Sequence, residues 1–136
     1  MSARGKARRR ALDILFEAEQ RATTPDEGIS HRRTSTEQVI NPYTVEIIHG
    51  VMAEQERIDE ILSSYAQGWT LERMPAVDRS ILRIGAWELL FNEDIPDGVA
   101  VAEAVTMAKE LSTEDSPDFI NGLLGRIQQL KPTLLG

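Results

Sequence analysis

The stretch PAVDRSILRIGAWELLFN, residues 75–92, decides the fold class of this 136-residue chain. Proline at position 75 suits the start of a helix, where a missing N–H leaves no intrahelical hydrogen bond unmade. The apolar side chains that follow recur at helical spacing and are too numerous for a narrow stripe: Val77, Ile81, Leu82, Ile84, Leu89 and Leu90. A helix that is apolar over so much of its circumference must be covered on several sides. The stretch therefore predicts the central helix of a helical bundle.

The segments on both sides of this helix have helical rather than alternating apolar spacing. No window has the β-branched, period-two pattern that is typical of strands. We expect helices over about 3–22, 42–52, 55–66, 99–111 and from 116 onward, with a short turn at 69–74. The spacing leaves open whether residues 50–54 form a kink or a short turn. The predicted fold class is all-α, a compact bundle of about six or seven helices.

Residues 23–41 interrupt the helical pattern. The segment contains Pro25, Gly28 and a polar run at 34–36, but few large apolar side chains. We interpret it as a long surface linker. Because the chain is too short to leave much room for a second hydrophobic core, we expect the linker to lie within one domain that spans 1–136.

The composition excludes several classes of protein. The chain has no cysteine, so it can form no disulfide, no thiolate metal site and no thiolate nucleophile. Its apolar runs are too short to cross a bilayer. The positively charged start lacks the apolar run of a secretory signal. We expect a cytoplasmic protein with no membrane contact.

Charge is distributed unevenly along the chain. The formal net charge is -7, yet the first ten residues contain no acid and five bases, which are Arg4, Lys6, Arg8, Arg9 and Arg10. The remainder has ten bases against 22 acids. This basic arm can attract phosphates, with a strength that falls as salt rises. A solvated, fraying terminus is the alternative. Arg4 and Arg8 lie on the apolar stripe of the first helix but beyond its large residues. This placement favours an edge of the protein at which a ligand docks over a simple solvated face.

The chain lacks the residue patterns of common catalytic sites. His31 and His49 have no i, i+4 partner of the kind that a helical zinc site uses. There is no glycine-rich phosphate loop and no serine between elbow glycines. We expect no enzyme activity, no metal and no cofactor. Trp69 and Trp87 are flanked by core-type residues, so packing in the core is favoured over base stacking.

Charged residues also gather around the start of the central helix, at Arg73, Asp78, Arg79 and Arg83. A carboxylate at position 78 stabilises the N-terminal end of the helix dipole and can pair with a neighbouring arginine. We expect a structural role for this cluster.

Residues 115–119, with the sequence DSPDF, form a second candidate site. Ser116 before Pro117 is typical of a helix N-cap. Such a start offers backbone N–H groups to a phosphate or a base edge, and an exposed Phe119 can stack on a base. An ordinary cap with Phe119 in the core is the alternative, and the two flanking acids make phosphate binding less favourable.

Five pieces of the chain, in order, resemble the NusB family. They are ARRRAL (7–12) leading into Leu15-Phe16, WTLERMPAVDRSILR (69–83), WELL (87–90), EAV with AKE (103–105 and 108–110), and DSPDFINGLL (115–124). The linker 23–41 has no counterpart in this resemblance. The matching pieces nevertheless cover nearly the whole chain.

The resemblance implies an RNA-binding protein that acts in transcription antitermination. It implies binding to the single-stranded boxA element of ribosomal RNA leader transcripts, together with the ribosomal protein NusE, and assembly on RNA polymerase. The family's RNA-binding positions correspond to Arg4, Lys6, Arg8 and Arg9 in the arm, and to Asp115, Ser116 and Phe119 in the second patch. Gly5 departs from the more basic arms of some members, which makes help from NusE in binding RNA more important. The resemblance also admits a homodimer.

Three other interpretations stay open at this point. A NusB-like helical domain also precedes the catalytic domain of a ribosomal RNA cytosine methyltransferase, but this chain ends at Gly136, just after its last predicted helix. A helix-turn-helix DNA-binding protein would have its basic residues after a tight turn, whereas here they lie at the N-terminus. A helical adaptor that never touches RNA would be unaffected by charge reversal in the arm.

Overall fold

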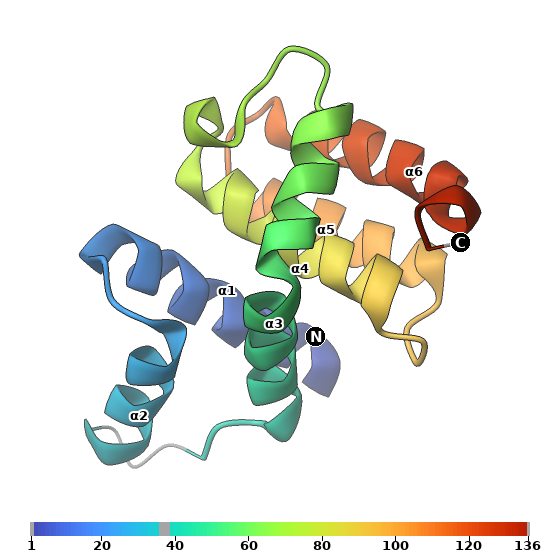
Figure 1. Cartoon of the computed structure of the whole chain (residues 1–136). Coiled ribbons are helices and arrows are strands. Elements are labelled where there is room, and N and C mark those ends of the chain that lie inside the picture. The colour runs from blue at the N-terminus through green and yellow to red at the C-terminus, as the bar shows by residue number, and fades with distance from the viewer. Residues whose placement is uncertain (1, 36–38, 136) are drawn as a thin grey trace.

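The computed structural model describes residues 2–35 and 39–135, and within them the chain forms six α-helices, one 3-10 helix and no strand (Figure 1). In chain order they are α1 (Ala3–Arg21), α2 (Pro25–Ser35), α3 (Pro42–Tyr65), η1 (Leu71–Arg73), α4 (Ala76–Phe91), α5 (Asp97–Leu111) and α6 (Ser116–Leu135). The predicted all-α fold class is confirmed, and so is the short turn between α3 and α4.

The central helix is α4, as its sequence predicted. It packs against α1, α3, α5 and α6, and most of its residues are buried. In Figure 1, α3 crosses in front of α4, while α1 and α6 lie on opposite sides of the bundle. Pro75 stands directly before the first helical residue, and its carbonyl accepts a hydrogen bond from the backbone N–H of Arg79 at 3.0 Å.

The long helix α3 is continuous through residues 50–54, so these residues do not form a turn between two helices. Gly50 lies inside it, where α3 crosses α4. A Cβ atom at this position would stand 2.2 Å from the indole ring of Trp87. Gly50 therefore marks a close approach of two helices. Trp87, with 6% of its surface exposed, lies in the core as predicted.

The interpretation of residues 23–41 as a linker is wrong for its first half, which forms α2. The start of α2 is a reciprocal capping box. The backbone N–H of Glu27 donates to Thr24 Oγ1 at 3.2 Å, and the N–H of Thr24 donates to the Glu27 carboxylate at 3.3 Å. Pro25 occupies the first helical position, so it promotes the helix that we took it to interrupt. Residues 36–38 of the predicted linker lie outside the described residues.

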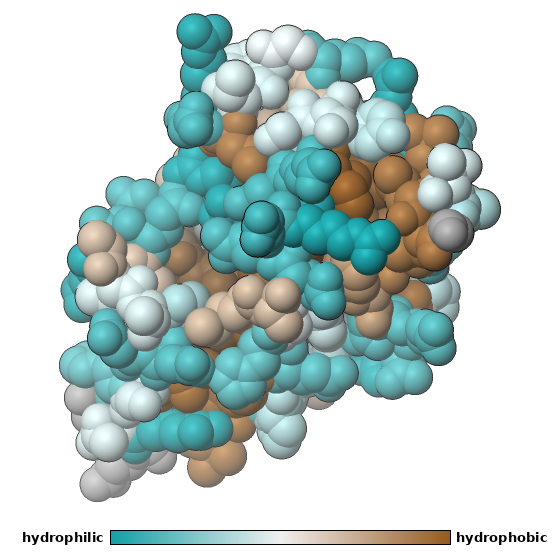
Figure 2. Space-filling model, viewed as in Figure 1, coloured by the Kyte–Doolittle hydropathy of each residue, from teal (hydrophilic) through white to brown (hydrophobic). Residues whose placement is uncertain are grey.

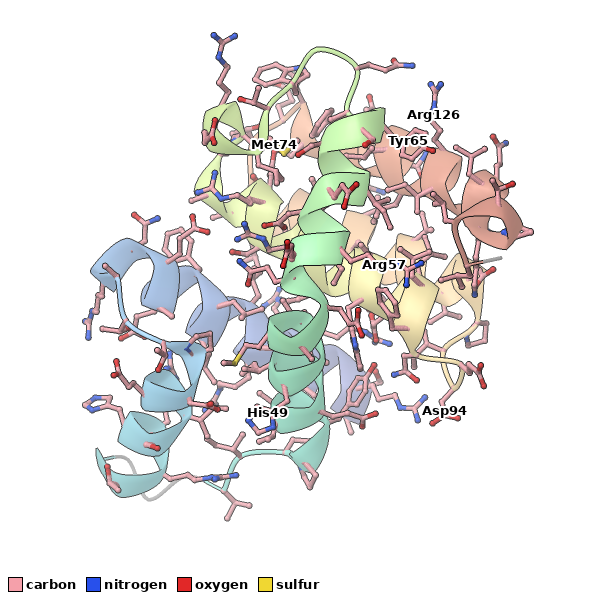
Figure 3. All side chains as sticks on the ribbon, in the orientation of Figure 1. His49, Arg57, Tyr65, Met74, Asp94 and Arg126 are labelled. Carbon is pink, nitrogen blue, oxygen red and sulfur yellow. The ribbon has the colours of Figure 1, made fainter. Side chains whose placement is uncertain are left out.

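Tertiary contacts hold this short helix in place. Ile29 is buried on the side that packs against α1, and Arg32 donates to Glu17 of α1 at 2.8 Å. Asp26 contacts His49 of α3 at 2.8 Å, and Figure 3 shows His49 at the end of α3 that faces α2. An isolated helix of this length is only marginally stable in water, so these contacts decide that it forms.

Buried hydrophobic side chains from all six helices form one cluster. Figure 2 shows a mostly hydrophilic face with smaller patches of hydrophobic residues, including one at the right of the view. Across residues 2–35 and 39–135, no helix is long and apolar enough to cross a membrane.

The charged cluster at the start of α4 is structural, although its pairing differs from the prediction. Asp78 is buried and accepts hydrogen bonds from Ser112 and Ser116. Within residues 2–35 and 39–135 it forms no ion pair with an arginine. Arg79 instead pairs with Glu19 of α1, which also accepts from Arg83 at 2.9 Å. These contacts tie α4 to the C-terminal half of α1.

The Glu19 pairing predicts a stability loss in acid. The hydrogen bond from Arg79 holds the pKa of Glu19 below its ordinary 4.5, despite partial burial. A carboxyl whose folded-state pKa is depressed stabilises the fold above its unfolded pKa, and that stabilisation disappears as pH falls through the folded value. We therefore expect Glu19→Gln to lower the free energy of unfolding at pH 7 and to lower it less at pH 3. Urea denaturation at both pH values measures this, and an equal loss at both would contradict it.

Candidate nucleic-acid interface

The basic arm is the first part of α1. The side chain of Ser2 caps the helix by accepting from the backbone N–H of Gly5 at 3.0 Å, so the helix is formed from Ala3 onward. The first turn contains no acid, and its cations add to the positive end of the helix dipole. Cations at this end are unfavourable within the isolated chain, and an anion docked there would relieve that repulsion.

Arg8 does not lie at an exposed edge, contrary to the prediction. Only 2% of its surface is exposed, and its Nε donates to both oxygens of Glu88 on α4, at 2.8 and 2.9 Å. A second carboxylate, Glu103 of α5, lies 3.6 Å from the guanidinium. Burial alone would lower the pKa of Arg8, but the hydrogen bond and charge of Glu88 outweigh it and raise the pKa. Arg8 is thus a charged anchor inside the protein.

Tyr43 joins this anchor to the surface of the arm. Its hydroxyl donates to Glu88 and accepts from the Asn92 amide at 3.1 Å. Burial and the adjacent carboxylate both raise the pKa of Tyr43, so the hydroxyl keeps its proton and remains a donor. The Arg4 guanidinium lies 5.5 Å from the centre of the Tyr43 ring, in cation–π range. Arg4 itself is exposed.

The other two predicted arm residues are also accessible. Lys6 is exposed and lines a pocket of about 330 Å³ between α1 and the start of α3. Arg9 is partly exposed and pairs with Glu110 in the last turn of α5. Exposed ion pairs contribute only about 0–1 kcal/mol, so a phosphate can compete with Glu110 for Arg9. The arm therefore presents Arg4, Lys6 and Arg9, held in place by Arg8.

In the second predicted patch, Ser116 plays a structural role. It is the first residue of α6 and is buried, and its hydroxyl donates to Asp78 Oδ2 at 2.8 Å instead of capping the helix. Since that proton is committed, the 2.7 Å contact with Thr113 requires the threonine hydroxyl to donate. Ser116 thus ties the start of α6 to α4.

Its neighbours Asp115 and Phe119 remain available. Asp115 is exposed and Phe119 is partly exposed, and both line a pocket of about 290 Å³ with Ser116 and Trp69. The expectation that Trp69 packs in the core is wrong, because 51% of its surface is exposed. Its ring lies 6.1 Å from that of Phe119, at 58°.

The two patches are distinct but adjacent along α5. The Arg9–Glu110 pair joins the arm to the last turn of α5, directly before the loop that carries Asp115. One patch offers cations for phosphates, and the other offers aromatic faces and a carboxylate for bases. That division of roles is typical of single-stranded RNA recognition.

The sequence analysis missed Glu88 and wrongly assigned Trp69 to the core, although each residue had a local signal. Glu88 is an acid inside an apolar run on the central helix, where a buried carboxylate requires a partner. Trp69 follows Gly68, whose φ of 90° turns the chain at the end of α3 and takes Trp69 out of the helical repeat. The partner of Glu88 and the exposure of Trp69 depend on segments that are distant in the sequence, and a local pattern does not reveal these contacts.

Comparison with known proteins identifies a family. The NusB family model matches residues 5–129. The transcription antitermination protein NusB of Arthrobacter sp. (strain FB24) is 67% identical over 135 residues, with 99% of each chain covered.

Solved structures agree with this assignment. NusB of T. maritima superposes with a TM-score of 0.82 at 32% identity, over 94% of this chain and 92% of that one. A chain from the crystal structure of antitermination factors NusB and NusE in complex with dsRNA has the same fold, with a TM-score of 0.81 at 24% identity over 93% of this chain and 96% of that one. The chain thus belongs to the NusB family, which includes the transcription antitermination protein of Arthrobacter.

Proposed function

We propose that the chain binds the single-stranded boxA element of ribosomal RNA leader transcripts jointly with NusE, and that this complex acts on RNA polymerase in antitermination. Membership of a family of antitermination proteins supports the process. The observation that carries the RNA contact is the helical, exposed cationic start of α1, in a protein whose remainder is acidic.

The buried Arg8–Glu88 pair beneath the arm gives the cationic surface a defined shape. A mobile basic tail attracts any polyanion, and it loses conformational entropy when it binds. Here the buried Arg8–Glu88 pair fixes the helix from which Arg4 and Lys6 project. The arm therefore loses less conformational entropy when it binds RNA. Phosphate contacts fix the position of the RNA. The protein must read the RNA sequence through contacts with unpaired bases elsewhere on its surface.

The acidic remainder favours a basic protein partner over a second nucleic-acid strand. Ten bases against 22 acids outside the arm would repel further phosphate. The fold neighbour described above was crystallised with NusE and dsRNA. NusE is therefore the partner that we propose for this chain, with RNA and NusE binding together.

The test is a charge reversal restricted to exposed arm residues. We expect Arg4→Glu/Lys6→Glu to weaken binding of boxA RNA in the presence of NusE by roughly tenfold or more, since charge-assisted contacts are lost and repulsion is added. Two lost phosphate contacts should also reduce the slope of log K against log salt by about 1.4. Fluorescence anisotropy at several salt concentrations measures both, with a scrambled RNA as the specificity control.

A matched variant, Arg57→Glu/Arg126→Glu, changes the net charge equally on exposed residues of α3 and α6, which Figure 3 shows away from the arm. It should retain nearly native affinity. Equal losses of RNA affinity in both double variants would show that net charge alone explains the effect of the arm substitutions. Equal binding of boxA and scrambled RNA by the native chain with NusE would contradict the proposed function.

A further inference from the structure

Tyr43 of α3 contacts two arginines of the arm, one exposed and one buried. Arg4 and Arg8 are four residues apart on α1 and therefore lie on the same face of the helix. Their guanidinium carbons stand 5.5 and 5.9 Å from the centre of the Tyr43 ring, both within cation–π range. The ring thus connects the surface cation Arg4 to the buried anchor Arg8.

The Tyr43 ring is itself held by α4. Its hydroxyl donates to Glu88 and accepts from the side-chain amide of Asn92, and the Trp87 ring lies 6.5 Å away at 45°. These three residues of α4 and its C-terminal end are all buried. The ring therefore offers Arg4 a contact surface whose position is set by the core of the protein.

An aromatic contact holds an arginine without using its charge. Arg9 pairs with Glu110, and a carboxylate of this kind neutralises a guanidinium and occupies N–H donors. Arg4, in contrast, forms no ion pair within the described part of the chain, and its contact is the ring of Tyr43. The face of a ring leaves the charge and the N–H donors of Arg4 available for a phosphate.

We propose that Tyr43 is a positioning residue for RNA binding: its ring holds the Arg4 guanidinium at the surface of the arm, where it contacts an RNA phosphate. The inference rests on the proposed function and adds to it a residue of α3 that lies in neither predicted patch. A flexible arginine loses side-chain entropy when it binds. A ring that restricts Arg4 beforehand reduces this loss and increases the contribution of Arg4 to RNA affinity.

The position of Lys6 limits this role to Arg4. Lys6 lines the pocket between α1 and the start of α3 together with Asn41 and Thr44, and Tyr43 is not part of that lining. Residues two apart on a helix do not face the same direction, so Lys6 and Arg4 project differently from α1. Lys6 is therefore an arm cation that Tyr43 does not position, and it provides a matched control.

The experiment measures binding of boxA RNA to Tyr43→Leu and Tyr43→Phe in complex with NusE. Loss of the ring in Tyr43→Leu should weaken binding roughly two- to fivefold, the scale of an exposed cation–π contact. Tyr43→Phe keeps the ring and should retain most of the affinity. A role of the hydroxyl alone predicts equal losses, because both substitutions remove its contact with Glu88.

A double-mutant cycle tests whether the effect passes through Arg4. In an Arg4→Gln background, Tyr43→Leu should cause almost no further loss, because the side chain that the ring positions is gone. In a Lys6→Gln background, the same substitution should cause its full loss. Fluorescence anisotropy measures the affinities, and circular dichroism checks that each variant is folded at the temperature of the measurement.

Fluorination of the ring provides a second test, which remains valid if Tyr43→Leu fails to fold. Phenylalanine and its ring-fluorinated derivatives at position 43 have similar sizes, but fluorine withdraws electron density from the ring face and weakens its attraction for a cation. The affinity for boxA RNA should fall stepwise as fluorine atoms are added. It should not respond to fluorination in the Arg4→Gln background.

The outcomes distinguish the inference from the proposed function. No boxA binding by the native chain with NusE would overturn both. Native binding that is unchanged in Arg4→Gln or in Tyr43→Leu would overturn the inference alone. The same holds for equal losses in Tyr43→Phe and Tyr43→Leu, for a Tyr43→Leu loss of the same size with and without Arg4, and for affinities that fluorination does not change.

Discussion

Replacement of Glu88 by alanine is expected to lower the free energy of unfolding by about 3–5 kcal/mol, because it leaves the Arg8 charge buried without its main partner. Glu103, 3.6 Å away and one-third exposed, is too distant to replace the bidentate contact. The Tyr43 hydroxyl loses its acceptor at the same time. Chemical denaturation followed by circular dichroism measures the change.

The double variant Arg8→Met/Glu88→Leu is the matched control. It removes both charges and fills the space with side chains of similar length, and buried ion pairs replaced in this way are often neutral in stability. We expect it to recover most of the loss. A loss of less than about 1 kcal/mol in Glu88→Ala would show that water enters and solvates Arg8. A double variant as unstable as Glu88→Ala would show that packing, not charge, dominates.

The second large effect is expected from Gly50→Ala, at the crossing of α3 and α4. The added methyl group would stand 2.2 Å from the Trp87 ring, a rigid side chain that fills the core. Overpacking of this kind lowers stability by about 1–3 kcal/mol or more, even though alanine is the better helix former. Thermal and denaturant unfolding of the variant measure the loss.

The same substitution in α6 should have the opposite sign. A Cβ at Gly122 or Gly125 meets no atom within 4 Å, so Gly122→Ala and Gly125→Ala are each expected to raise stability by about 0.5–1 kcal/mol through helix propensity. A second test replaces Trp87 by leucine, which should make Gly50→Ala less damaging. Similar unfolding free energies for Gly50→Ala and Gly122→Ala would contradict the close approach of α3 and α4.

The helical fold and the identity of its central helix follow from local sequence. The apolar spacing of residues 75–92 is a property of the helical repeat, and proline and capping residues act on adjacent backbone groups. Even α2, which we took for a linker, has its start signal in Thr24 and Glu27. The basic arm and the DSPDF segment could also be located as candidate sites, because charge and motif are properties of the local sequence.

How these residues are used depends instead on contacts between segments that are distant in the sequence. Arg8 is buried because Glu88, 80 positions later, lies opposite it, and Ser116 is occupied because Asp78 reaches it from α4. Trp69 follows a turn that removes it from the helical repeat, and 51% of its surface stays exposed although its ring lies beside Phe119 of α6. Periodicity states which face of a helix is apolar, but whether a side chain is covered, paired or free depends on which distant segment lies against it.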